Sequence, residues 1–201
     1  MAMRIGLGLA AAMLVVATPL AAQQVTGAPA RDFKLTDMDG KTVQLSQYKG
    51  KTVVLEWNNP GCPFVKKHYD SGNMQKTQAA ARRDGAVWLT INSGAPGKQG
   101  HMTGAEARAF VAAEKATPTD YLLDAKGVVG KTYAAKTTPH MYVIAPDGTL
   151  AYAGGIDDVP TANPADIAKA QPLVKLALAD VQAGKPVGTP TSRPYGCSVK
   201  Y

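Results

Sequence analysis

Residues 53–69 read VVLEWNNPGCPFVKKHY and combine a buried strand, a tight turn and the start of a helix. Pro63 suits the first helical position, where its missing N–H costs nothing, so Cys62 is predicted to be the N-cap. A thiol among the free N–H groups of a helix start is stabilised as thiolate, and its pKa falls from about 8.5 to between about 3.5 and 7.5. Lys66, one turn later, is expected to add positive charge on the same face. Cys62 is therefore a candidate nucleophile, and the alternative is a buried, inert cysteine.

The N-terminal segment has the pattern of a secretory signal peptide. Arg4 gives a positive start, residues 5–17 are apolar, and small residues precede Gln23. Residues 1–22 are thus predicted to be a signal peptide and residues 23–31 a flexible lead-in. An uncleaved membrane anchor is the alternative, although the apolar stretch is barely long enough to span a bilayer. We expect an exported protein, periplasmic in a Gram-negative bacterium, with no stable membrane association after cleavage.

Composition indicates one globular domain. The 201 residues are 45% hydrophobic and 18% charged, which suits a domain over residues 32–183 followed by a Pro- and Gly-rich tail over residues 184–201. The net charge of +7 is dispersed along the chain, so nucleic acid is not an expected partner. The two cysteines, Cys62 and Cys197, both lie in the exported part, and an oxidising compartment favours a disulfide over a metal site.

Strand and helix patterns alternate along the chain. The near-continuous apolar run before the cysteine suits a central strand covered on both faces. Thr103 and Glu106 have capping-box spacing and predict a helix start. The expected strands are 32–36, 41–45, 51–57, 86–91, 121–123, 141–144 and 149–153, and the expected helices are 63–70, 73–83, 103–115, 127–134 and 163–183, the last interrupted at Pro172. A polar, Gly-rich loop is expected over residues 92–102. This order predicts an α/β sandwich with a mixed central sheet flanked by helices, with an N-terminal hairpin and an extended C-terminal tail.

The strand, turn, Cys-Pro and helix, together with Thr137-Thr138-Pro139 before a later strand and hairpin, resemble the thioredoxin fold. Gly-Cys-Pro-Phe-Val at the turn and Gly-Cys-Ser-Val-Lys near the C-terminus resemble its peroxiredoxin-like branch of exported redoxins (the AhpC/TSA type). The resemblance covers roughly residues 30–201. It implies that Pro139 is cis and faces Cys62, and that the backbone of Thr138 is available for pairing with a substrate chain.

The sequence departs from its relatives at two points. Thioredoxins and disulfide isomerases carry a second cysteine three residues after the first, where this chain has Val65. Typical peroxiredoxins carry Thr or Ser three residues before the cysteine and Pro seven before it, where this chain has Asn59 and Leu55. The Asn59 amide can still donate a hydrogen bond to a substrate. A one-cysteine site with a distant partner remains.

The tail offers that partner. About 13 residues separate Gly184 from Cys197 and can span on the order of 40 Å, enough to return the second cysteine to the first. The hypothesis is an antioxidant thiol oxidoreductase without a cofactor: Cys62 attacks a peroxide or a disulfide, Cys197 resolves the product, and an external thiol reduces the enzyme. Two alternatives for Cys197 stay open: a permanent disulfide with Cys62, and a bridge to another chain.

A different class of function rests on two His-Met pairs. His101-Met102 and His140-Met141 repeat, and the second pair follows Pro139 directly. Thiolate, thioether and imidazole suit Cu(I), so an extracytoplasmic copper-binding protein is one alternative, with His140 and Met141 as weak candidate ligands. A thioredoxin-fold binding protein that has lost catalysis is the other.

Overall fold

The computed structural model describes residues 24–201, so the predicted signal peptide lies outside the described residues. Within residues 24–201, nine strands and five α-helices follow one another, with 3₁₀ turns at Leu45–Tyr48 and Pro164–Lys169. The strands are β1 (Lys34–Asp37), β2 (Thr42–Gln44), β3 (Val53–Trp57), β4 (Val87–Asn92), β5 (Asp120–Leu123), β6 (Thr137–Thr138), β7 (His140–Ile144), β8 (Leu150–Gly154) and β9 (Cys197–Ser198). The helices are α1 (Pro63–Asp70), α2 (Asn73–Arg83), α3 (Gly104–Ala113), α4 (Val128–Thr132) and α5 (Leu173–Gln182). Within residues 24–201, no helix has the length and apolar character needed to cross a membrane.

The main sheet has seven strands in the order β2-β1-β5-β4-β3-β7-β8. β3 is an interior strand of this sheet, parallel to β4 on one side and antiparallel to β7 on the other. All five residues of β3 are buried, as the apolar run predicted, because helices or loops cover both faces of the sheet. The carboxyl end of β3 leads directly into the turn that carries Cys62, so a fully buried strand positions the candidate site.

Two apolar layers enclose the sheet. On one face, α1, α2 and α5 pack on alternate residues of the central strands, among them Val54, Trp88 and Val143. On the other face, α4 and the segment around Phe33 cover the opposite set, including Leu89. α3 packs beside β5. Alternation along each strand therefore divides the core between the two layers, which confirms the predicted α/β sandwich with a mixed sheet.

Two parts of the chain differ from expectation. Residues 24–31, expected to be a flexible lead-in, bond to the β8 hairpin, with Gly27 N donating to Leu150 O at 2.9 Å and Ala30 N to Gly148 O at 2.8 Å. Backbone pairing thus orders a stretch that its Gly and Pro content predicted to be loose. The predicted helix over 163–183 is interrupted at Pro172 as expected, but its first part is a 3₁₀ turn, and only α5, after Pro172, is α-helical. The Thr103–Glu106 capping box is present as predicted.

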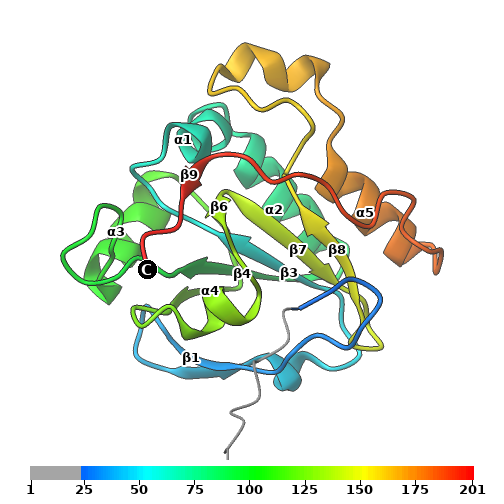
Figure 1. Ribbon diagram of the computed structural model, residues 1–201, viewed down its shortest axis with the longest axis horizontal. Coiled ribbons are helices and arrows are strands. Elements are labelled where there is room, and N and C mark those ends of the chain that lie inside the picture. Colours follow the sequence, from blue (N-terminus) through cyan, green and yellow to red (C-terminus); the bar gives the residue numbers. More distant parts are fainter. Residues whose placement is uncertain (1–23) are drawn as a thin grey trace, which may run out of the picture.

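The tail returns to the centre of the molecule. From α5 it runs back along the edge of β8, where Ser192 N donates to Ala153 O at 3.2 Å, and crosses the end of the sheet to β9 (red in Figure 1). There β9 pairs with β6 in a small antiparallel sheet of its own. β6 and β9, about sixty residues apart in sequence, therefore meet next to the N-terminal end of α1.

Candidate functional site

Cys62 is the N-cap of α1, as the sequence predicted. Its backbone is extended, Pro63 occupies the first helical turn, and the Cys62 carbonyl accepts from the N–H groups of Val65 and Lys66, both at 3.0 Å. A further bond from Cys62 N to Asn59 O at 3.0 Å closes the turn that follows β3. The Cys62 thiol thus lies at the positive end of the dipole of α1, the helix that follows β3.

Two groups from distant parts of the chain contact the Cys62 sulfur. The thiol donates to the Thr138 carbonyl at 3.0 Å, and Cys197 N donates to the sulfur at 3.4 Å. The residue is fully buried. Burial by itself would raise the pKa of the Cys62 thiol, but hydrogen bonds from the side chain and backbone of Cys197, with smaller ones from the Thr138 side chain and the Val65 backbone N–H, outweigh it and lower that pKa. The thiolate is therefore favoured by donors that point at the sulfur.

Cys197 contacts Cys62 from 135 residues away in the sequence. It pairs with Thr138 in the β6–β9 ladder, is half-buried, and both cysteines are free thiols. Burial raises the pKa of Cys197 to about 11, together with the hydrogen bond and charge of Cys62. One sulfur of the pair is thus disposed to be thiolate while the other keeps its proton.

The Thr138–Pro139 peptide bond is cis, which confirms the expectation from the resemblance. The Thr138 carbonyl reaches Cys62, while its hydroxyl donates to the Cys197 carbonyl at 3.4 Å. The loop before β7 therefore contacts both cysteines at once.

The AhpC/TSA family model matches residues 26–153 of the chain. The chain belongs to the AhpC/TSA family. The matched region contains Cys62 and the cis-proline loop, whereas Cys197 and the whole tail lie beyond it. No curated protein matches the chain in sequence.

Solved structures place this AhpC/TSA protein among thioredoxin folds. An uncharacterized conserved protein from Geobacillus kaustophilus is 25% identical with a TM-score of 0.75, the alignment covering 88% of this chain and 92% of that one. A hypothetical protein from Sinorhizobium meliloti is 26% identical with a TM-score of 0.75, covering 90% and 96%. A putative thiol:disulfide interchange protein DsbE from Chlorobium tepidum shares the fold at 22% identity and a TM-score of 0.59, covering 80% and 99%.

Two residues proposed for the site are occupied elsewhere. The Asn59 side chain is held by Gln99, to which its amide donates at 3.0 Å, and its oxygen accepts from Gly61 N at 2.9 Å. It shapes the turn before Cys62 and connects the turn to the 92–102 loop. Lys66 is exposed, and hydrogen bonds rather than its charge lower the pKa of Cys62. The expectation that Lys66 activates the thiol therefore finds no support in the geometry.

The candidate copper ligands are only partly gathered. Met141 packs in the same apolar cluster as Cys62. The His140 ring instead turns its Nδ1 toward Tyr142 Oη at 3.1 Å and the backbone N–H of Lys136 at 3.3 Å. Burial, with Lys136 nearby, lowers the pKa of His140 to about 3, so the ring is neutral. Among residues 24–201, no three His, Cys, Asp or Glu side chains cluster as a metal site.

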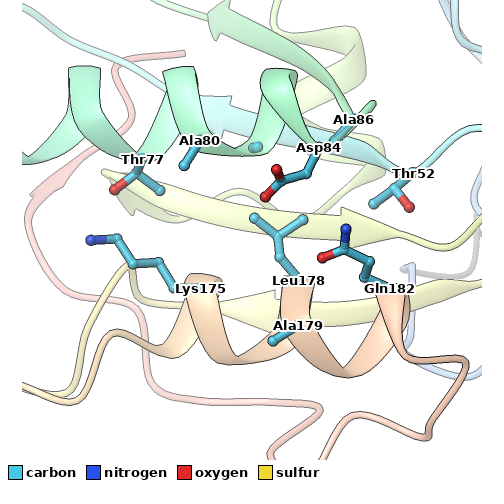
Figure 2. Close-up of a pocket in the computed structure, with 10 residues that line it drawn as sticks. Thr52, Thr77, Ala80, Asp84, Ala86, Lys175, Leu178, Ala179 and Gln182 are labelled. Atoms are coloured by element: carbon cyan, nitrogen blue, oxygen red, sulfur yellow. The ribbon is translucent and has the colours of Figure 1, made fainter.

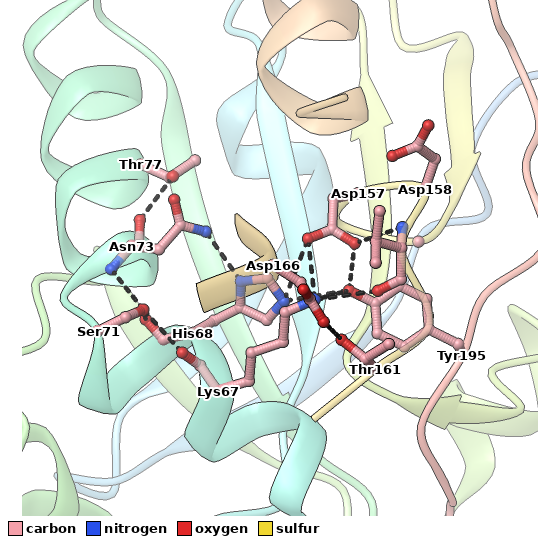
Figure 3. A network of polar contacts seen from close by, with 12 residues as sticks. Lys67, His68, Ser71, Asn73, Thr77, Asp157, Asp158, Thr161, Asp166 and Tyr195 are labelled. Carbon is pink, nitrogen blue, oxygen red and sulfur yellow. Dashed lines mark hydrogen bonds and ion pairs between the residues drawn. The ribbon is translucent and has the colours of Figure 1, made fainter. Parts of the chain in front are cut away.

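A buried polar cluster beside the site was not anticipated. Lys67 and His68 on α1 meet Asp157 and Tyr195, the last of which lies in the tail two residues before Cys197 (Figure 3). Sequence spacing gave one usable signal for it: His68 stands three residues after buried Val65 on a helix face that points inward.

Two of the surface hollows differ in how close they lie to the cysteines. One of about 220 Å³ separates α2 from α5 and is lined by Thr77, Asp84, Lys175, Leu178 and others (Figure 2). No cysteine faces it. A groove of about 490 Å³ follows the tail instead, and its lining includes Thr137, Arg193 and Gly196, which flank the cysteine pair. This groove is the opening nearest to the chemistry.

Proposed function

We propose that this AhpC/TSA protein is a two-cysteine thiol peroxidase in which Cys62 is the nucleophile and Cys197 resolves the product. The observation that carries the proposal is the contact between a buried thiol of lowered pKa and a second free thiol from a distant segment. Family membership supports the general class, a thioredoxin-fold redox protein, and the geometry supports the finer assignment.

The first step follows from the thiolate. The Cys62 sulfur attacks one peroxide oxygen, an S–O bond forms as the O–O bond breaks, and the leaving alkoxide or hydroxide takes a proton to become alcohol or water. Sulfur is oxidised to sulfenic acid and the peroxide is reduced. The Thr138 carbonyl accepts a hydrogen bond from the thiol before reaction, and the Cys197 backbone N–H supplies a donor at the reacting sulfur.

The second step uses the raised pKa of Cys197. A thiol with a pKa of about 11 keeps its proton while Cys62 reacts, so it does not compete as a nucleophile for peroxide. It then attacks the sulfenic sulfur, an S–S bond forms as the S–O bond breaks, and the thiol proton leaves with the hydroxide as water. Two electrons from an external thiol donor reduce the disulfide and return both cysteines to the starting state.

Burial favours a small oxidant over a polypeptide disulfide. Cys62 is fully buried, and the tail covers it through the β6–β9 pairing. A peroxide needs an opening of only a few atoms, while a disulfide on another protein requires the tail to leave. The groove beside Thr137 and Gly196 offers a small oxidant a route towards Cys62 that leaves the tail in place.

A single-turnover experiment tests the proposal. Reduced protein is mixed with hydrogen peroxide, and the product is read by mass spectrometry and by tryptophan fluorescence. Wild type is expected to end as a Cys62–Cys197 disulfide, Cys197→Ser to stop at sulfenic acid, and Cys62→Ser to stay unreacted. A wild-type rate no faster than that of a free thiol would refute peroxidase activity and favour a non-catalytic binding role.

Export is part of the same proposal. The positive start and apolar residues 5–17 support a cleaved signal peptide, and an oxidising destination suits a thiol pair that cycles through a disulfide. Cell fractionation with mass analysis of the mature N-terminus tests it, and a retained residue 1 in a soluble cytoplasmic fraction would contradict it.

Copper(I) binding is a second candidate, favoured by one observation. Two free thiols in contact supply the soft donors that Cu(I) prefers, and Met141 lies in the same apolar cluster. Competition against a Cu(I) chelator of middle affinity decides it: transfer of the metal to wild type but not to Cys197→Ser supports the site, and no transfer excludes it.

A further inference from the structure

The polar cluster between α1 and the tail is almost fully removed from water. Lys67 Nζ lies 3.3 Å from the Asp157 carboxylate, with side-chain exposures of 0% and 5%. The same Nζ donates to Val159 O at 3.0 Å and lies 3.4 Å from Tyr195 Oη. His68 Nε2 stands 3.2 Å from that hydroxyl. Figure 3 shows these side chains converging on Asp157.

Tyr195 is the tail's contribution to the cluster. Its hydroxyl donates to Asp157 Oδ1, its ring lies 5.3 Å from Lys67 Nζ, and Phe64 packs edge-on at 5.8 Å. Burial and the bond to Asp157 raise the pKa of Tyr195, so the hydroxyl keeps the proton that it donates. The tail is thus fastened to α1 by charge-assisted contacts with fixed directions.

The position of this fastening relative to the cysteines is what matters. Cys62 caps α1, and Lys67 stands five residues further on the same helix. Tyr195 precedes Cys197 by two residues. One rigid helix therefore carries the nucleophile at its start and the anchor of the second cysteine along its length.

Stability alone gives little reason for a buried ion pair at this place. Removing two charges from water costs several kcal/mol, and apolar replacements of equal volume are often as stable. Directional bonds do give a single arrangement of the segments they join, which an apolar contact gives less sharply. An anchor of this kind restricts where the next two residues of the tail can lie.

We propose that Tyr195, held by Asp157 and Lys67, is a positioning residue that keeps Cys197 against Cys62. The inference rests on the proposed pairing of the two cysteines and adds the device that sets it. Downstream of Cys197 the tail has separate attachments, since Val199 N donates to Lys136 O at 3.1 Å and Ala95 N to Lys200 O at 2.7 Å. Upstream, Ser192 N still donates to Ala153 O, so loss of the Tyr195 hydroxyl frees only the few residues between Ser192 and Cys197.

The effective concentration of Cys197 toward Cys62 measures this positioning. Full-length protein is equilibrated with reduced and oxidised glutathione: the two protein thiols are oxidised to one disulfide while one oxidised glutathione is reduced to two thiols. Tyr195→Phe keeps the ring and removes the hydroxyl. We expect the effective concentration to fall about tenfold, the lower end of the effect of losing a hydrogen bond to a charged group.

Tyr48→Phe is the matched control. Its hydroxyl also donates to an aspartate, Asp120 Oδ2 at 2.7 Å, but lies far from the cysteines. It should leave the glutathione equilibrium unchanged. Asp157→Asn is a second variant. In the double variant with Tyr195→Phe, the loss of effective concentration should not exceed the larger of the two single losses, because both changes act on the same hydrogen bond.

The outcomes separate this inference from the proposed function. An unchanged equilibrium in Tyr195→Phe, or additive losses in the double variant, overturns the positioning role. Wild type that forms the disulfide with glutathione but ignores peroxide removes the peroxidase proposal and leaves the positioning test intact. Wild type that forms no Cys62–Cys197 disulfide overturns both.

Discussion

Glu56 offers a quantitative test of how α1 and α2 are held to the main sheet. Its carboxylate is fully buried on β3 and accepts five hydrogen bonds. The donors come from α1, from α2, from β4 and from the turn after β3. They are Tyr69 Oη at 2.7 Å, Gln78 Nε2 at 3.1 Å, Trp88 Nε1 at 2.8 Å, Thr90 Oγ1 at 3.0 Å and Asn58 Nδ2 at 3.3 Å. One charged group thus fastens two helices to the central strands.

Glu56→Gln keeps the shape and replaces one acceptor oxygen by a donor. At the Oε1 position the new amide meets Tyr69 and Asn58, and Asn58 cannot easily turn over because its own oxygen accepts from Tyr121 Oη at 3.0 Å. Two bonds to a charged acceptor are worth about 3–6 kcal/mol, and rotation of the Tyr69 hydroxyl recovers about 1 kcal/mol of neutral hydrogen bonding. Relief from burying a charge offsets a further part, so we expect a loss of about 3 kcal/mol in unfolding free energy.

Urea unfolding followed by tryptophan fluorescence measures this loss as a lower midpoint with an unchanged slope. Glu106→Gln is the matched control, because that carboxylate is hydrogen-bonded only in an exposed capping box, where glutamine also serves. Its midpoint should not move. A loss below about 1 kcal/mol in Glu56→Gln would refute the hydrogen-bond accounting.

Three further predictions follow from pKa shifts and backbone geometry. Alkylation of Cys62 by iodoacetamide should show a midpoint below the ordinary thiol pKa. Cys197→Ala should raise that midpoint, because it removes the side-chain hydrogen bond that favours the Cys62 thiolate while keeping the backbone one; an unmoved midpoint would place the cause elsewhere. Burial lowers the pKa of His68 to about 4; the charge of Asp157 opposes this shift and the charge of Lys67 adds to it. Because the unfolded chain then binds a proton that the folded chain does not, the unfolding free energy should fall between pH 6.5 and 4, by about 3 kcal/mol relative to His68→Gln. Urea titrations at several pH values measure this, and parallel pH curves for the two proteins would contradict it. Gly196→Ala should slow disulfide formation after peroxide, since φ is +130° and a Cβ would overlap the Thr138 carbonyl oxygen. Gly188→Ala is the control: the nearest neighbour of its Cβ would lie at 3.7 Å, so this variant should react like wild type.

Local signals in the sequence predicted the part of the site that local chemistry determines. A buried strand, a turn and Pro63 define the position of Cys62, and all three signals lie within a few residues of it in the sequence. The cis bond before Pro139 was predicted only through the family resemblance. Cys197 was predicted to be within reach because the tail is long enough.

The remaining features depend on contacts that sequence spacing does not encode. Asp157 and Tyr195 lie 90 and 128 residues from Lys67, so no periodic pattern connects them. Lys66 and Lys67 differ by one position on the helix, and 100° of rotation puts one in water and the other in the core. Asn59 looked free to bind substrate because its partner, Gln99, stands forty residues away.

The β6–β9 pairing also bears on association between molecules. Thr137 and Thr138 form a very short strand whose backbone groups are satisfied by Ser198 and Cys197 of the same chain. An open strand edge next to the Cys62 thiol would invite pairing with a second copy of the chain. By adding its own strand there, the chain closes that edge. The segment that carries the second sulfur thereby also covers the backbone of this short strand.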